Sequence, residues 1–244
     1  IGIMSHNAMD ERCVQNQREQ PRTTGEYHKI NSLYKRDPSG KMMLFGLFAQ
    51  PEFEYLKNCE WVFTEKVDGT NIRVIVADGK IRFGGKTDNA QISTKLLTRL
   101  QEQFLSDAGK SLLEKIQSGV LYGEGFGPGI QSGGLYRADQ AFVLFDVNVD
   151  GWWLLREAVE DVAKSLELEI VPIVGRGTLA DLESLVQSEF KSAWGDCKAE
   201  GVVARPAVEL RTRSGERIIT KLKVKDFLTQ RSGTADLTHR INPQ

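Results

Sequence analysis

The chain has 244 residues, of which 40% are apolar and 27% charged, and its 32 Lys and Arg against 33 Asp and Glu leave a net charge of −1. These values are ordinary for a globular protein with a buried core, and they exclude a fibrous, collagenous or wholly disordered chain. A chain of this length forms one large or two small domains. No apolar run approaches the ~18 residues of a membrane-spanning helix, and the near-neutral charge argues against nonspecific wrapping of nucleic acid.

The cysteines carry little functional information. Cys13, Cys59 and Cys197 are far apart, form no C-x-x-C pair, and are accompanied by only three histidines. This pattern predicts free thiols rather than a disulfide framework or a zinc site. We therefore expect a reducing, cytoplasmic location and no contact with a membrane.

Polar, aperiodic sequence marks both ends of the chain. Residues 1–25 are predicted to be a flexible N-terminal tail, or in part a cloning remnant, because the chain opens on Ile1 rather than on Met. A folded domain is expected over residues 26–228, and residues 229–244 are predicted to be a short C-terminal tail.

Short β-type runs and three helical stretches lie between these ends. Strands are predicted at residues 61–64, 72–77, 80–84, 120–123, 142–147, 152–154, 201–205, 209–213 and 217–225. Helical periodicity covers residues 94–116, with an interruption at Gly109, and residues 156–166 and 179–190. Because these elements lack regular βαβ spacing, we predict an α+β domain with largely antiparallel sheets flanked by helices.

The first candidate site is the run EKVDGTN at residues 65–71. Its lysine lies between two apolar strands and close to a glycine, which lets the backbone approach a ligand. An amine attacks only when it is deprotonated, and a low dielectric or neighbouring cations favour that form. The run therefore suggests a nucleophilic Lys66, although K-x-D-G alone is also typical of an exposed hairpin.

The second candidate is the glycine-rich run LYGEGFGPGIQ at residues 121–131, which surrounds Glu124. Each glycine costs extra backbone entropy on folding, so four of them are a costly way to build a plain turn. A carboxylate at a strand end, among such flexible main chain, suits a ribose hydroxyl. An ordinary surface loop is the alternative interpretation.

Three further segments are weak when taken alone. Residues 142–147 (FVLFDV) and 200–205 (EGVVAR) are typical of core strands. In residues 221–225 (KLKVK) three lysines alternate with apolar residues, so on a strand they would share one face and favour an anion there. Residues 205–225 hold seven basic and two acidic side chains, a local net charge of +5, which indicates a phosphate-rich ligand.

Together, in this order and with these separations, the five segments resemble motifs I, III, IIIa, IV and V of the covalent nucleotidyltransferase superfamily of DNA ligases, RNA ligases and mRNA capping enzymes. The similarity is closest to the RNA ligase 2 family. Asn71 stands where K-x-D-G-x-R enzymes carry arginine, and GPGIQ follows the glutamate of motif III. The resemblance covers residues 27–227 and implies an ATP-grasp-like ligase adenylation domain as the fold.

The resemblance implies an ATP-dependent RNA ligase. Lys66 would attack the α-phosphate of ATP to form lysyl-AMP, and the AMP would pass to an RNA 5′-phosphate that is then sealed to a 3′-OH. The implied nucleotide contacts are Glu65 to the adenine amine, Glu124 to the ribose, Phe145 stacked on the base, and Lys221 and Lys223 to the α-phosphate. The other implied roles are Glu200 beside Mg²⁺ or Mn²⁺, Asn71 at the RNA end, and Asp68 and Asp146 in support.

The chain departs from the family pattern at two positions. Asp68 is the usual acidic residue of the superfamily, whereas RNA ligase 2 itself carries a histidine there. At motif Ia the family generally has arginine, and the best-aligned residue here is Lys86, with Arg82 as the alternative register. Lysine supplies charge without a bidentate fork, so looser phosphate contacts are expected.

Two other functions remain open at this stage. A GTP-dependent capping guanylyltransferase would share the K-x-D-G run but would be expected to carry arginine at position 71. A catalytically silent nucleotide- or RNA-binding domain is disfavoured by the lysines and carboxylates of the five segments. Only 17 residues follow Phe227, so we expect a partner protein or a further C-terminal module to assist in gripping RNA ends.

Overall fold

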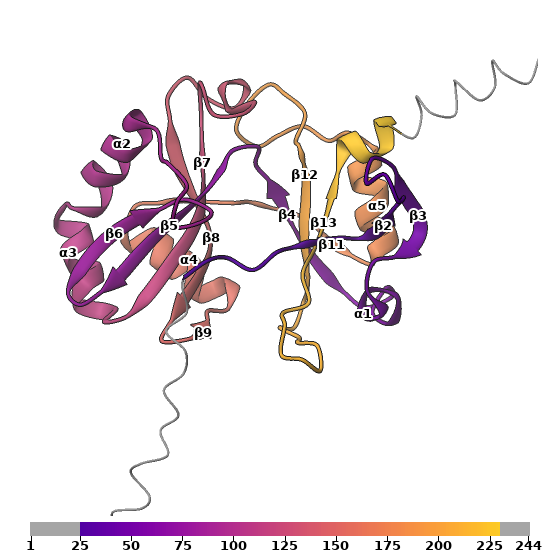
Figure 1. The fold of residues 1–244 in the computed structure, drawn as a ribbon, viewed down its shortest axis with the longest axis horizontal. Coiled ribbons are helices and arrows are strands. Elements are labelled where there is room, and N and C mark those ends of the chain that lie inside the picture. The colour runs from indigo at the N-terminus through magenta and orange to yellow at the C-terminus, as the bar shows by residue number, and fades with distance from the viewer. Residues whose placement is uncertain (1–24, 230–244) are drawn as a thin grey trace, which may run out of the picture.

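The computed structural model describes residues 25–229, and most of the two predicted tails lies outside these described residues. The chain forms two main β-sheets that lie side by side, with helices packed against each (Figure 1). No helix in residues 25–229 is both long and apolar enough to cross a lipid bilayer. The predicted α+β class, with mixed and antiparallel sheets and flanking helices, is confirmed.

One sheet has five strands. Their order is β1 (Asn31–Ser32), β13 (Thr220–Lys223), β12 (Gly201–Pro206), β4 (Trp61–Lys66) and β11 (Ile173–Gly177). β1 pairs with β13 in parallel and the other neighbours are antiparallel. Helix α5 (Leu179–Gln187) packs against this sheet and begins at a capping box between Thr178 and Asp181.

The other sheet has six strands. Its order is β10 (Glu169–Ile170), β8 (Ala141–Val149), β7 (Gly119–Phe126), β5 (Thr70–Ala77) and β6 (Lys80–Gly84), with β9 (Trp152–Trp153) paired to β8. On β5, Ile72, Val74 and Val76 alternate into a core that helix α2 (Thr94–Phe104) closes. Helices α3 (Asp107–Lys115) and α4 (Arg156–Ser165) complete this half.

The sequence did not predict the elements that precede the first motif. β2 (Tyr34–Arg36) and β3 (Met43–Phe48) form a two-stranded sheet, and α1 (Pro51–Tyr55) follows it. Leu33, Tyr34 and Met43 pack these elements into the core of the five-stranded sheet. β2 has only three residues and is too short to show periodicity, and the six residues of β3 (MLFGLF) show no alternation of apolar and polar side chains, so only the tertiary packing reveals these strands.

The predictions for three segments were wrong. The long helical stretch breaks at residues 105–106 rather than at Gly109, which lies inside α3 where a side chain would collide with the backbone of Phe104. The strand predicted at 217–225 ends at Lys223, and residues 224–229 are helical. Residues 209–213 form no strand, only an isolated bridge between Arg211 and Arg217.

A buried carboxylate joins the two sheets. Asp146 of β8 is fully buried, and its Oδ2 accepts hydrogen bonds from Tyr27 Oη at 2.7 Å, Arg217 Nη1 at 2.7 Å and Arg205 Nη2 at 2.9 Å. Burial alone would raise the pKa of Asp146, but the two arginines and the tyrosine hydroxyl outweigh it and hold that pKa below its usual value. Arg205 lies on β12, so these bonds connect one sheet to the other.

Asp146→Ala is expected to lower the free energy of unfolding by about 3–5 kcal/mol, because it leaves two arginines partly buried without their shared partner. Urea denaturation followed by circular dichroism measures the loss. Glu102→Ala is the matched control: Glu102 pairs with Arg99 at 3.3 Å where both side chains are more than half exposed, so its loss should cost under about 1 kcal/mol. Equal effects of the two substitutions would contradict the central role of Asp146.

Candidate active site

Lys66 lies where the chain passes from one sheet to the other. It is the last residue of β4, and residues 67–69 lead directly into β5 of the six-stranded sheet. A Cβ on Gly69 would collide with the carbonyl oxygen of Gly125 on β7, so only glycine allows this close approach. The junction therefore presses the lysine motif against the glycine-rich strand.

The strand register aligns Lys66 with the second lysine motif. Gly201 of β12 pairs with Lys66 on one side and with Lys223 on the other, so the three residues form one row across the sheet. Glu200, which precedes β12, accepts from Lys66 Nζ at 2.6 Å and from Lys223 Nζ at 2.5 Å. One carboxylate thus holds both amines, each of which is still about one-fifth exposed.

Two more lysines surround this row. Lys221 precedes Lys223 by two residues on β13, so both side chains leave the same face of the sheet. Burial lowers the pKa of Lys221, and the charges of Lys223, Lys66 and Lys86 lower it further against the opposing effect of Glu200. The charge of the predicted motif Ia lysine, Lys86, thus reaches Lys221, and the ion pairs of Glu200 hold only two of these four cations, Lys66 and Lys223.

The loop that carries Lys86 is held by an arginine that the sequence reasoning missed. Arg73 of β5 is fully buried, and its guanidinium donates to the Gly85 carbonyl at 2.7 Å and to Asp88 Oδ1 at 2.8 Å. A charged residue inside the apolar run IRVIV was the available signal, because buried arginines are rare without partners. These bonds fix the backbone on both sides of Lys86.

Glu124 and Asn71 are direct cross-strand neighbours on β7 and β5. The pKa of Glu124 is raised to about 8, mainly by burial; the charges of Glu200 and Asp68 add to the rise, and those of Lys66 and Lys223 oppose it. Asn71 Oδ1 is buried and has no hydrogen-bond partner among the described residues. An unpaired buried acceptor is costly, so this part of the site is suited to a polar ligand that donates to it.

Phe145 occupies an irregular position on β8. Tyr122 pairs with Asp146 and Gly123 pairs with Leu144, so Phe145 falls at a β-bulge between them. Bulges redirect side chains and are frequent beside active sites. The half-buried ring packs against a small apolar cluster of Val67, Phe126, Tyr136, Val143 and Val171.

Glu65 points to the opposite face of β4 from Lys66, since side chains alternate along a strand. It is 1% exposed, and its Oε2 accepts from the backbone N–H of Ala193 at 2.9 Å. Its Oε1 has no partner among residues 25–229. An apolar cluster near a buried, unsatisfied carboxylate oxygen suits a planar base with an amino group at its edge.

The two supporting aspartates have different surroundings. Asp68 Oδ2 accepts from the backbone N–H of Ser132 at 3.3 Å, which ties the junction loop to the glycine-rich loop. Asp146 lies beside Phe145 in sequence but turns away into the buried network with Tyr27 and the two arginines. Its contacts therefore hold the sheets together rather than contribute to the lysine cluster.

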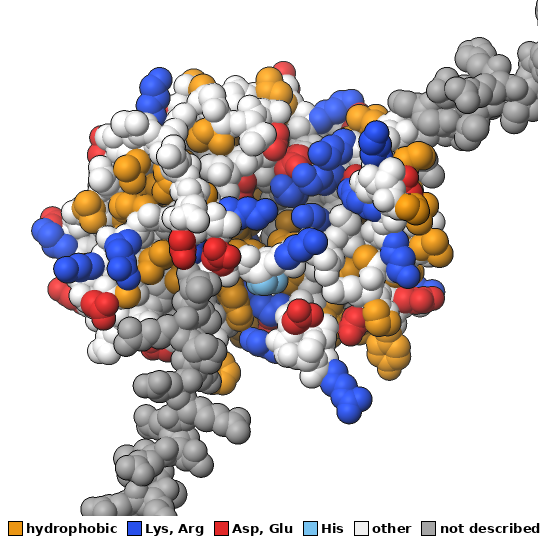
Figure 2. Space-filling model, viewed as in Figure 1, with side chains coloured by type: hydrophobic (Ala, Val, Ile, Leu, Met, Phe, Trp, Pro, Cys, Tyr) orange, Lys and Arg blue, Asp and Glu red, His pale blue; other side chains and the backbone are white. Residues whose placement is uncertain are grey.

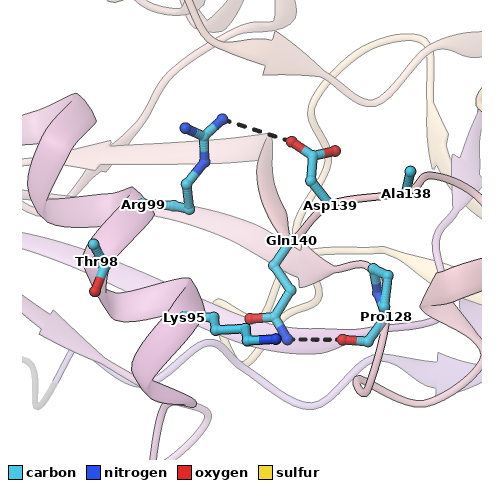
Figure 3. Close-up of a pocket in the computed structure, with 7 residues that line it drawn as sticks. All are labelled: Lys95, Thr98, Arg99, Pro128, Ala138, Asp139 and Gln140. Carbon is cyan, nitrogen blue, oxygen red and sulfur yellow. Dashed lines mark hydrogen bonds and ion pairs between the residues drawn. The ribbon is translucent and has the colours of Figure 1, made fainter.

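A separate cavity of about 540 Å³ lies beside the glycine-rich loop (Figure 3). Its lining residues are Lys95, Thr98, Arg99, Pro128, Ala138, Asp139 and Gln140. Gln140 donates to the Pro128 carbonyl at 2.8 Å, and Arg99 pairs with Asp139 at 3.6 Å, so these groups satisfy one another. None of the predicted site residues lines this cavity.

Solved structures with the same fold are RNA ligases. The Naegleria gruberi RNA ligase with PPi matches with a TM-score of 0.59 and 20% identity over 88% of this chain and 64% of that one. Variants of the same enzyme, one with ATP and Mn and one with AMP and Mn, match with a TM-score of 0.59 and 18% identity over 84% of this chain. The chain spans 59% and 60% of the length of those two structures.

The family follows from the sequence match. The RNA ligase family model matches residues 59–223, which run from just before the first lysine motif to the last residue of β13. The chain belongs to the RNA ligase family. The reaction, its substrates, the RNA ligase 2 assignment and the residue roles are proposals.

Glu124→Gln is expected to make stability less dependent on pH. The folded pKa of about 8 lies above the ordinary 4.5, so the folded state binds more protons than the unfolded state between these values. Glu124 then lowers the free energy of unfolding by up to about 1.4 kcal/mol per pH unit as pH rises through this window. The variant should gain stability relative to the wild type toward pH 8, measured as Tm without nucleotide.

The exposed Glu157 of α4 provides the matched control for this measurement. Glu157→Gln makes the same chemical change without burial, so its Tm curve should run parallel to that of the wild type from pH 4.5 to pH 8. A Glu124→Gln curve that is also parallel would show that Glu124 titrates normally in the folded protein.

Proposed function

We propose that this protein is an ATP-dependent RNA ligase of the RNA ligase 2 type. Lys66 forms the lysyl-AMP intermediate, AMP passes to an RNA 5′-phosphate, and the activated end is sealed to a 3′-OH. The observation that carries the proposal is made at the lysine row. There the Glu200 carboxylate bridges the amines of Lys66 and Lys223, at 2.6 and 2.5 Å.

This row accounts for the first chemical step. The deprotonated Lys66 amine attacks the α-phosphorus of ATP, the bond to the bridging oxygen breaks, and pyrophosphate leaves with the electron pair. Lys221, Lys223 and Lys86 offset the charge that spreads over the phosphate oxygens, which is the main requirement of such transfers. In the second step an RNA 5′-phosphate oxygen displaces the Lys66 amine from AMP, and Asn71 engages that RNA end.

The base-binding end of the site favours ATP over GTP. Phe145 offers a ring face at the bulge, and Glu65 keeps one buried oxygen without a partner among the described residues. Adenine presents an amino donor where guanine presents a carbonyl oxygen, and a carboxylate oxygen would repel the latter. Glu124, on the neighbouring sheet, is assigned to the ribose hydroxyls.

A divalent cation fits the oxygen ligands of this site. Within residues 25–229 no three His, Cys, Asp or Glu side chains gather into a metal cluster, so a protein cage is absent from this part of the chain. Mg²⁺ commonly uses one or two carboxylates together with water and substrate phosphates. Glu200 would hold Mg²⁺ or Mn²⁺ in this way, and the cation would neutralise phosphate charge; two of the matched Naegleria structures contain Mn.

Lys66→Ala is expected to abolish the covalent adduct. Wild-type protein incubated with α-labelled ATP and Mg²⁺ should carry label through denaturing electrophoresis, and label from GTP should be absent. Lys110→Ala is the matched control, because it removes an exposed lysine of α3 and should leave labelling unchanged. Labelled Lys66→Ala protein would show that the nucleophile is misassigned, and GTP labelling would favour a capping-type enzyme.

Phe145→Ala is expected to raise the KM for ATP in adenylation about 5- to 150-fold, since stacking of a base on an aromatic ring contributes about 1–3 kcal/mol. Phe53→Ala separates this effect from lost packing. Phe53 is fully buried in the other core, so its truncation should cost about 3–5 kcal/mol of stability without changing the KM. A large loss of stability in Phe145→Ala with an unchanged KM would assign Phe145 to the core.

A further inference from the structure

A groove lined by basic residues continues from the lysine row along the edge of the five-stranded sheet. Its volume is about 430 Å³, and residues of β1, β2 and β13 line it. Every charged side chain in its lining is a cation: Lys29, Lys35, Arg36, Lys221, Lys223 and Lys225. We call this feature the basic groove; Figure 2 shows Lys and Arg side chains gathered from the middle of the molecule toward this side.

The groove is assembled by strand pairing and by one buried carboxylate. β1 runs parallel to β13 with Ser32 opposite Lys221, which brings the segment that begins at Lys29 alongside the motif V lysines. Asp226, whose side chain is 4% exposed, accepts from Arg36 Nη2 at 2.8 Å and from the backbone N–H of Lys223 at 3.2 Å. Asp226 therefore fixes Arg36 and the end of β13 together.

The outer cations of the basic groove are not neutralised by the described part of the chain. Lys29, Lys35 and Lys225 are exposed and form no ion pair within residues 25–229. Repulsion among the inner lysines already acts on Lys221. Burial lowers the pKa of Lys221, and the neighbouring cations lower it further. A bound polyanion would relieve this accumulation of like charge.

We propose that the basic groove binds the sugar–phosphate backbone of the RNA strand whose end reacts at Lys66, without reading its bases. This inference rests on the proposed function. The groove shares Lys223 with the lysine row and also contains the neighbouring Lys221, so a strand lying in it leads straight to the site.

Two further features favour backbone contacts. The one aromatic residue in the lining, Tyr34, is 6% exposed and donates its hydroxyl to Glu183, so bases find no stacking surface there. Lys35 lies on β2 and Lys225 in the helical segment that follows β13, so the groove draws its cations from separate elements, which suits a continuing strand better than the two phosphates of pyrophosphate.

The test is a triple variant, Lys29→Ala with Lys35→Ala and Lys225→Ala. Anisotropy of a fluorescent, 5′-phosphorylated single-stranded RNA measures binding across a salt series. The variant should bind about 10- to 100-fold more weakly at low salt, and the slope of log K against log salt should become shallower by about 2. Oligo(U) and oligo(A) probes should lose the same factor, since the bases are not read.

A matched triple variant removes Lys110, Lys115 and Lys164, which are exposed on α3 and α4. If both triple variants weaken RNA binding equally, the loss follows from net charge alone, and the proposal is overturned. Unchanged RNA affinity and salt slope in the groove variant would also overturn it. A third outcome would also overturn the proposal: the groove variant binds RNA normally, but added pyrophosphate removes AMP from its lysine more slowly than from the wild type. The groove would then bind the pyrophosphate leaving group and not RNA.

Adenylation with ATP alone, measured on the same samples, separates this inference from the proposed function. The groove variant should form lysyl-AMP at a rate within about twofold of the wild type, because its three lysines lie outside the row that contacts ATP. Wild-type protein that binds RNA through the groove yet forms no adduct would refute the proposed function and leave the groove assignment intact.

Discussion

The pairing of Asp146 with Arg205 and Arg217 is the contact on which the relative position of the two sheets depends. The carboxylate is completely buried, and together with Glu209, which bonds Arg217 at 2.5 Å, the cluster balances two negative against two positive charges. Its desolvation cost is tolerable only because each charge has a partner. Arg205 also lies on the strand that begins with Gly201, and Asp146 is adjacent to Phe145. The network thus sets where the β-bulge at Phe145 lies relative to the lysine row.

Lys66 depends on the same arrangement from the other side. Because its strand passes into the second sheet within three residues, Lys66 cannot shift without moving β5, and β5 carries both Asn71 and the arginine that holds the Lys86 loop. The lysines of motif I, motif Ia and motif V come from different elements, yet they meet because the sheets are joined at this crossing and at Asp146. Preorganised charge of this kind is what nucleotidyl transfer requires.

Local patterns predicted much of this fold and little of what joins its halves. Short β-type runs at residues 72–77 and 80–84 indicated β5 and β6 with their boundaries nearly correct, since this signal is contained in the segments themselves. Arg205 and Arg217 looked like part of a basic face for a phosphate-rich ligand. Their partner is 59 and 71 residues away in the sequence, so their structural role is visible only in the fold.

In the site, too, local sequence patterns predicted some features, while others are visible only in the fold. Lys223 and Glu200, which the motifs singled out, do lie beside Lys66, because the strand register aligns their segments, whereas Glu65 points to the opposite face of β4. The basic groove was only partly foreseen. Lys225 leaves the strand on which it was expected, Lys29 lies in the segment before β1, and Lys35 and Arg36 lie on the three-residue β2, which is too short to show periodicity. Parallel pairing of β1 with β13 joins residues far apart in the chain, which no local pattern indicates.

The bridge from Glu200 to Lys66 and Lys223 means that the free enzyme carries its own counter-ion. In the proposed reaction, a nucleotide phosphate that enters the row replaces Glu200 as the partner of the Lys66 and Lys223 amines, so at these two lysines the number of close ion pairs changes little. Screening by salt weakens the internal pair and the incoming one alike, and the two losses largely cancel. The exposed lysines of the basic groove make no such exchange, since a phosphate there adds new pairs. Rising ionic strength would therefore weaken the binding of RNA more than the binding of the nucleotide. The same protein could then keep its covalently bound AMP while it releases RNA.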